Sequence, residues 1–128
     1  MNILLDTNVF LHMTMEPHRL TKKARVLIED PATSLFLSSV SVGEIALKYS
    51  LRKLPLPKPP SQFVPEQRHI YAIQSLPLHE SSTLLLESLP LLHKDPFDRM
   101  LICQALEHGM AILTSDEEMS QYEVQTLW

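Results

Sequence analysis

Four acidic residues that are far apart in the chain all stand beside short apolar runs or at predicted helix starts. Asp6 directly follows an apolar run and Asp116 stands shortly after another, whereas Glu44 and Asp98 each lie near the start of a predicted helix. Carboxylates that meet in a folded protein raise one another's pKa unless a cation lies among them. A site of oxygen ligands, without Cys or His pairs, favours Mg²⁺ or Mn²⁺. Such a site can clamp a phosphodiester, polarise it and activate water for hydrolysis.

Each acid also has a purely structural explanation, because carboxylates and hydroxyls are preferred at helix starts. Asp6 could be an N-cap, and Ser41 and Glu44 could form a capping box. Ser115 and Glu118 could form a second box, with Asp116 near the positive end of the helix dipole. An N-cap at Asp95 would put Asp98 at the third helical position. Capping accounts for each acid alone. It does not require four acids at one edge of a sheet.

Strands alternate with helices along the chain, which predicts an α/β fold with a parallel sheet of about five strands flanked by helices. The predicted strands are 2–5, 34–38, 70–75, 110–114 and 124–128. The predicted helices are 7–13, 20–30, 41–51, 61–69, 79–88 and 96–108, the last stopped by Gly109, and a short helix that starts at Ser115. The carboxyl ends of parallel strands lie on one edge, where ligands bind. We therefore expect the four acids at this edge.

The composition limits the class of protein. A chain of 128 residues, 45% of them hydrophobic, fits one domain over residues 1–128 with a sizeable core. A net charge of −4 argues against a broad basic surface for nucleic acid, but allows an enzyme that meets phosphates through metal ions. The lone Cys103 excludes an internal disulfide. Because we find neither a membrane-length apolar run nor a basic leader, we expect a cytoplasmic protein.

Four segments of the chain match a known family in their order and spacing. They are LLDTNVF (4–10), SVGEIALK (41–48), HKDPFDRMLI (93–102) and LTSD (113–116). Together they resemble the PIN-domain proteins, and specifically the VapC-type ribonuclease toxins of type II toxin–antitoxin systems. The resemblance spans essentially the whole chain, and the combination is far more specific than any one segment.

The resemblance implies a PIN-like fold and Mg²⁺- or Mn²⁺-dependent endonucleolytic cleavage of RNA. It also implies a homodimer and inhibition by a cognate antitoxin protein. Asp6, Glu44 and Asp98 match the family's three principal acids, and Asp116 matches the fourth, more variable one; all four would be catalytic residues and metal ligands. Asp95 belongs to the His-x-Asp-Pro-Phe-Asp pattern of a subgroup and is a second-rank candidate.

Two threonines could support the acids. Thr7 would shape the turn that presents Asp6, and either Thr7 or Thr114 could contact the waters of the metal. The histidines His12 and His93 are interpreted as packing or hydrogen-bonding residues, because hard cations prefer oxygen ligands.

Two basic residues each allow two interpretations. Lys48 lies one helical turn after Glu44 and on the same face, so it could meet a substrate phosphate or form a surface pair with Glu44. Arg99, beside Asp98, has the same two interpretations. Both are second-rank candidates for the site.

Two other functions compete with a ribonuclease. The chain could be a catalytically inactive PIN-like module that binds nucleic acid or protein, although its complete set of acids speaks against this. It could instead be a phosphohydrolase with Asp6 as nucleophile, in the manner of haloacid-dehalogenase-like enzymes. Those enzymes carry a second Asp two residues later, where this chain has Asn8.

Overall fold

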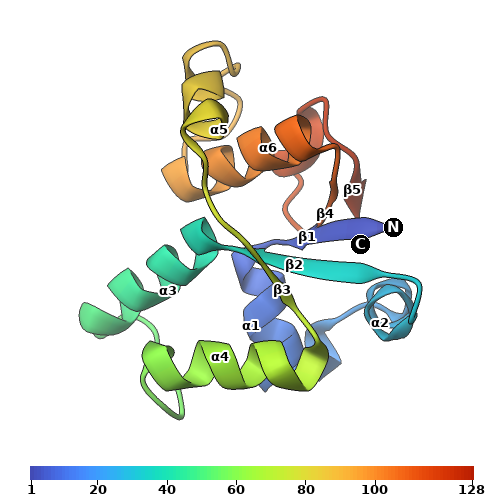
Figure 1. Cartoon of the computed structure of the whole chain (residues 1–128), viewed down its shortest axis with the longest axis vertical. Coiled ribbons are helices and arrows are strands. Elements are labelled where there is room, and N and C mark those ends of the chain that lie inside the picture. The colour runs from blue at the N-terminus through green and yellow to red at the C-terminus, as the bar shows by residue number, and fades with distance from the viewer.

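A computed structural model describes all residues, 1–128, as a five-stranded sheet flanked by helices (Figure 1). The strands are β1 (Asn2–Leu5), β2 (Ser34–Ser38), β3 (Gln74–Leu76), β4 (Ala111–Leu113) and β5 (Thr126–Leu127). The helices are α1 (Thr7–Met15), α2 (Lys22–Glu29), α3 (Ser39–Ser50), α4 (Pro60–Tyr71), α5 (Glu80–Leu84) and α6 (Pro96–His108), with 3₁₀ turns at Pro17–Arg19, Leu85–Glu87 and Met119–Gln121. The predicted parallel α/β fold is confirmed.

The sheet has the strand order β3-β2-β1-β4-β5, and all neighbouring strands are parallel. The chain builds outward from β1 to β2 and β3, and then returns to place β4 on the other side of β1. The boundary between β1 and β4 is therefore a topological switch point, where the following segments diverge to leave a crevice at the carboxyl ends of the strands.

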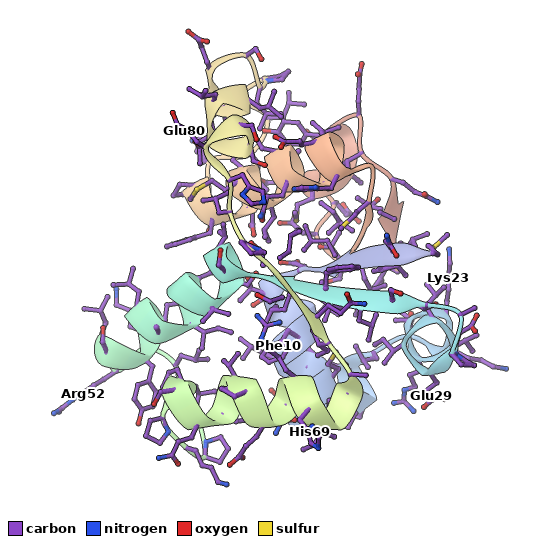
Figure 2. All side chains as sticks on the ribbon, viewed as in Figure 1. Phe10, Lys23, Glu29, Arg52, His69 and Glu80 are labelled. Atoms are coloured by element: carbon purple, nitrogen blue, oxygen red, sulfur yellow. The ribbon has the colours of Figure 1, made fainter.

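Two apolar layers cover the sheet. In Figure 1, α1, α2 and α4 lie on one face, and α5 and α6 lie on the other. Ile3 and Leu5 of β1 pack in the first layer and Leu4 packs in the second, as expected for a strand whose side chains alternate between faces. Phe10 of α1 lies in the first layer (Figure 2), where its ring meets Phe63 of α4 edge-on at 6.3 Å between centroids. The central strands are thus fixed from both sides.

The start of α3 differs from the predicted capping box. The helix begins at Ser39, and Ser38 is its N-cap, with a side-chain oxygen that accepts a hydrogen bond from the Val40 amide. Glu44 is consequently the sixth residue of the helix and lies too far along it to bond the cap amide. The capping box at Ser41 and Glu44 was wrong because Ser38, at the end of the strand, starts the helix three residues earlier.

The start and end of α6 match the sequence prediction. The Asp95 carboxylate accepts hydrogen bonds from the amides of Phe97 and Asp98, at 2.8 and 3.1 Å. Asp98 is therefore the third residue of α6, as predicted. Gly109 ends the helix with a left-handed backbone, φ 65°, which glycine adopts without a Cβ clash.

Two other predicted elements differ from the structure. The strand expected at 70–75 forms at Gln74–Leu76 as β3, because α4 runs on to Tyr71 and is capped by Ala72, which has φ 53°. No α-helix starts at Ser115, because the chain there forms turns and then a 3₁₀ turn at Met119–Gln121. None of the helices combines the length and the apolar character needed to cross a membrane.

Candidate metal centre at the carboxyl edge of the sheet

Asp6 lies at the switch point, directly after β1. Its amide bonds the Leu113 carbonyl of β4 at 3.0 Å, and its Oδ2 accepts a 2.7 Å hydrogen bond from the Thr114 hydroxyl. Although Asp6 is the N-cap of α1 by position, its side chain makes no capping hydrogen bond, and only 4% of the residue is exposed. Burial raises the pKa of Asp6, and the charges of Asp116 and Glu44 add to this rise. Helix capping therefore does not explain its carboxylate.

Glu44 brings a second buried carboxylate to the edge, from the second turn of α3. The residue is 5% exposed, and its Oε2 forms a 2.6 Å ion pair with Lys48. Its Oε1 is buried and has no hydrogen-bond partner. Buried polar atoms are nearly always hydrogen-bonded, so an unpaired carboxylate oxygen indicates a partner that the protein itself does not supply.

Asp98 lies on the first turn of α6, where the Asp95 cap fixes its position. Burial raises the pKa of Asp98 to about 7, and the charges of Asp6 and Asp95 contribute to the rise. A carboxyl group with this pKa binds a proton or a cation near neutral pH, since its ionised form is otherwise poorly stabilised.

Asp116 is the most exposed of the four acids and lies in the loop after β4. Its amide bonds the Thr114 hydroxyl at 3.0 Å, and its Oδ1 accepts a 2.9 Å hydrogen bond from the Glu118 amide. Its Oδ2 lies 2.8 Å from Nε2 of His93, which is also 3.0 Å from Oδ2 of Asp98. A turn thus holds Asp116 where a helical cap was predicted, and His93 links it to Asp98.

The four acids influence one another electrostatically, as a shared site requires. The charge of Glu44 raises the pKa of both Asp6 and Asp98, and Asp116 acts on Asp6. The structure places Asp6 directly after β1, Glu44 on α3, Asp98 on α6 and Asp116 after β4. The ligand atoms that lie within 4.8 Å of one another belong to His93, Asp98 and Asp116. A metal site shared by all four acids stays a prediction.

The second-rank residues take different places. The Thr7 hydroxyl donates to Ser41 at 2.8 Å in the buried floor behind Asp6. Lys48 pairs with Glu44 and keeps 45% of its side chain exposed; the Glu44 hydrogen bond raises its pKa.

Arg99 donates to the carbonyls of Leu89 and Pro90 and to the Tyr122 hydroxyl. Its guanidinium therefore fixes the loop before α6, a role that neither sequence interpretation proposed.

His93 is the residue whose importance the sequence prediction understated. It was expected to make hydrogen bonds, but not to the acids themselves. The signal was present in the spacing His93-x-Asp95-x-x-Asp98, which places an imidazole beside the helix start that carries two candidate acids.

The donor set fits a hard divalent cation. It consists mainly of carboxylate oxygens and includes the unpaired Oε1 of Glu44. Burial, with the charges of Asp6 and Asp95, also raises the pKa of Asp98 to about 7, and a cation would favour its ionised form. The largest surface hollow, about 800 Å³ between α5, α6 and the 119–123 turn, contains none of these acids. Concavity alone would have pointed to the wrong place.

Comparison with known proteins agrees with the fold and the motifs. The PIN-domain family model matches residues 3–125. A protein named Ribonuclease VapC22, from Mycobacterium tuberculosis, is 27% identical over 122 residues, which cover 94% of this chain and 91% of that protein. Ribonuclease VapC16 of the same organism is 38% identical over 58 residues, 40% of this chain and 41% of that protein.

Solved structures match over nearly the whole length. VapBC2 from Rickettsia felis, bound to promoter DNA, gives a TM-score of 0.69 at 13% identity and covers 99% of this chain and 98% of that one. VapBC-1 from nontypeable Haemophilus influenzae gives 0.64 at 18% identity, with 99% and 97% covered. At these low sequence identities, the structural similarity shows the fold alone. Together with the family match over residues 3–125, they lead to one conclusion: this chain belongs to the PIN-domain family.

Proposed function

We propose that this protein is a metal-dependent endoribonuclease that acts as the toxin of a toxin–antitoxin pair. The observation that carries the proposal is the buried, unpaired Oε1 of Glu44, whose carboxylate charge helps to raise the pKa of both Asp6 and Asp98. The homologues named as VapC ribonucleases support RNA as the substrate.

Asp6, Glu44, Asp98 and Asp116 would hold Mg²⁺ or Mn²⁺. The bound cation would supply positive charge against the phosphodiester and lower the pKa of a water molecule. The chain's own residues orient the ligands: Thr114 holds one oxygen of Asp6, and the Asp95 cap fixes Asp98. Lys48, half-exposed at the rim beside Glu44, would meet a phosphate of the RNA backbone.

A protein antitoxin is the proposed partner. The solved structures of the same fold include VapBC complexes from Rickettsia felis and Haemophilus influenzae. We propose that residues 1–128 act as one domain, in a homodimer, in the cytoplasm, with the antitoxin covering the acidic edge. A complex whose acidic edge stays fully open would contradict this mode of inhibition.

Cleavage of defined RNA by the purified protein tests the proposal. We expect cleavage with Mg²⁺ or Mn²⁺, none with EDTA, and a loss of about 100-fold or more in Asp6→Asn. Glu29→Gln on α2, which Figure 2 shows on the opposite side of the molecule from α3, is the matched control for loss of one negative charge. Equal cleavage by wild type and Asp6→Asn would contradict the site. Tight metal binding without cleavage would favour an inactive binding module.

A further inference from the structure

His93 lies between two of the acids, with a hydrogen bond between Nε2 and Asp116 and a close contact from Nε2 to Asp98. It lies in the loop before α6, it is 8% exposed, and its amide bonds the Tyr122 hydroxyl at 2.9 Å. Ring Nε2 lies 3.0 Å from Asp98 Oδ2 and 2.8 Å from Asp116 Oδ2. The three candidate ligand atoms lie within 4.8 Å of one another. Position alone would thus allow His93 to be a metal ligand.

The other ring nitrogen decides against that role. The Asp95 amide donates a 3.1 Å hydrogen bond to Nδ1 of His93. An amide can only donate, so Nδ1 must offer its lone pair, and the single proton of a neutral imidazole then stands on Nε2. A protonated Nε2 has no lone pair with which to bind a metal.

Glu118 is the one group that would favour the opposite tautomer. Its Oε2 lies 3.4 Å from Nδ1, and 59% of its side chain is exposed. The Asp95 amide is closer, and it belongs to the rigid backbone at the start of α6. Two carboxylate oxygens also face Nε2, and both need a donor. The geometry therefore favours the proton on Nε2.

We propose that His93 is a positioning residue: its Nε2–H donates to Asp116 and lies against Asp98, so it orients these two acids for the metal without coordinating it, and the Asp95 amide fixes this tautomer. The proposal rests on the proposed metal-dependent function. It gives Asp95 two supporting tasks, since its carboxylate caps α6 and its amide orients the imidazole.

Nuclear magnetic resonance of the protein with ¹⁵N-labelled histidine tests the tautomer directly. Although burial opposes it, the hydrogen bond to Asp116 and the charge of Asp98 raise the pKa of His93, so the spectra are recorded above that pKa, where the ring is neutral. We expect His93 to be protonated at Nε2 and unprotonated at Nδ1, both without metal and with Mg²⁺. A proton on Nδ1 alone would overturn the proposal. The metal-free measurement needs neither metal binding nor RNA cleavage, so it separates a failure of this inference from a failure of the proposed function.

Electron spin echo spectroscopy of the Mn²⁺-loaded protein tests whether the ring coordinates. We expect no directly bound nitrogen. A manganese–nitrogen coupling that disappears in His93→Gln would overturn the proposal; the variant is needed because the chain has 6 His residues.

Manganese affinity of variants tests the positioning role. Loss of a residue that orients ligands typically weakens metal binding by about 10- to 100-fold, and we expect this in His93→Ala. His93→Gln keeps an N–H donor and should recover part of the loss. The matched control is His69→Ala on α4, labelled in Figure 2, which should bind as wild type does. Wild-type manganese affinity in a folded His93→Ala variant would overturn the proposal. If that variant does not fold, the measurement of the His93 tautomer decides.

Discussion

Glu44 and Lys48 form a 2.6 Å ion pair that uses only one oxygen of a buried carboxylate, Oε2. The other oxygen, Oε1, is buried without a partner. One oxygen of this carboxylate therefore has its partner within α3 and the other has none, while the charge of the group acts on Asp6 and Asp98. A bound cation would supply the partner that Oε1 lacks, because Lys48 pairs only with Oε2.

Lys48→Met should destabilise the metal-free protein more than the metal-bound protein. It removes the one cation that pairs with buried Glu44, at an expected cost of about 1–2 kcal/mol, because the Lys48 side chain itself is half-exposed. When Mg²⁺ is bound, it balances the negative charge of Glu44 in place of Lys48. Urea denaturation with EDTA and with Mg²⁺ measures both values.

The control for this comparison is Lys58→Met, which breaks the exposed pair with Glu66. Exposed pairs contribute little, so we expect a change below about 1 kcal/mol that Mg²⁺ does not alter. A Lys48→Met penalty of the same size with and without Mg²⁺ would contradict the shared-cation account.

Metal-free protein should lose stability as pH rises from about 4 towards 8. The pKa of Asp98 is raised from its usual 3.8 to about 7 in the folded state, so the folded state holds the proton more tightly than the unfolded chain does. This contribution is fully present below about pH 4 and disappears as pH passes 7. The raised pKa of Asp6 acts in the same direction.

Thermal unfolding in EDTA across this pH range checks the prediction. Asp98→Asn should flatten the profile, because an amide does not titrate, and Mg²⁺ should stabilise wild type most at the alkaline end. A metal-free melting temperature that rises steadily from pH 4 to about 8 would be incompatible with these pKa shifts.

Thr114→Val should weaken metal binding while it preserves side-chain shape. The variant removes the hydroxyl that donates to Asp6 Oδ2 and accepts from the Asp116 amide, so two ligands lose their support. We expect a loss of about 10- to 100-fold in Mn²⁺ affinity, with recovery in Thr114→Ser. Calorimetric titration measures it, and unchanged affinity in Thr114→Val would show that Asp6 needs no such support.

The sequence predicted the elements that carry strong local signals. β1, β2 and α6 have the bounds expected from apolar runs, the Asp95 cap and the Gly109 stop. The third strand was expected at 70–75 but forms at Gln74–Leu76, because Ile70 and Tyr71 belong to the last turn of α4. In a short apolar run, hydrophobic periodicity does not distinguish a buried strand from the buried end of a helix.

The order of strands and helix starts was enough to predict that the acids lie at one edge of the sheet. It was not enough to predict the hydrogen bonds and burial of each acid. The capping box at Glu44 was excluded only once Ser38 was seen to start α3. The bridge from His93 to Asp98 and Asp116 joins the loop before α6 to the loop after β4. Such a contact depends on tertiary packing, which no local pattern encodes.

Anomalous diffraction from crystals grown with Mn²⁺ tests the central claim most directly. We predict a manganese peak at the carboxyl edge of the sheet, in contact with Asp6, Glu44 and Asp98, with the unpaired Oε1 of Glu44 among its ligands. Crystals with manganese bound elsewhere, or with no manganese at this edge while Glu44 contacts Lys48 alone, would contradict the account.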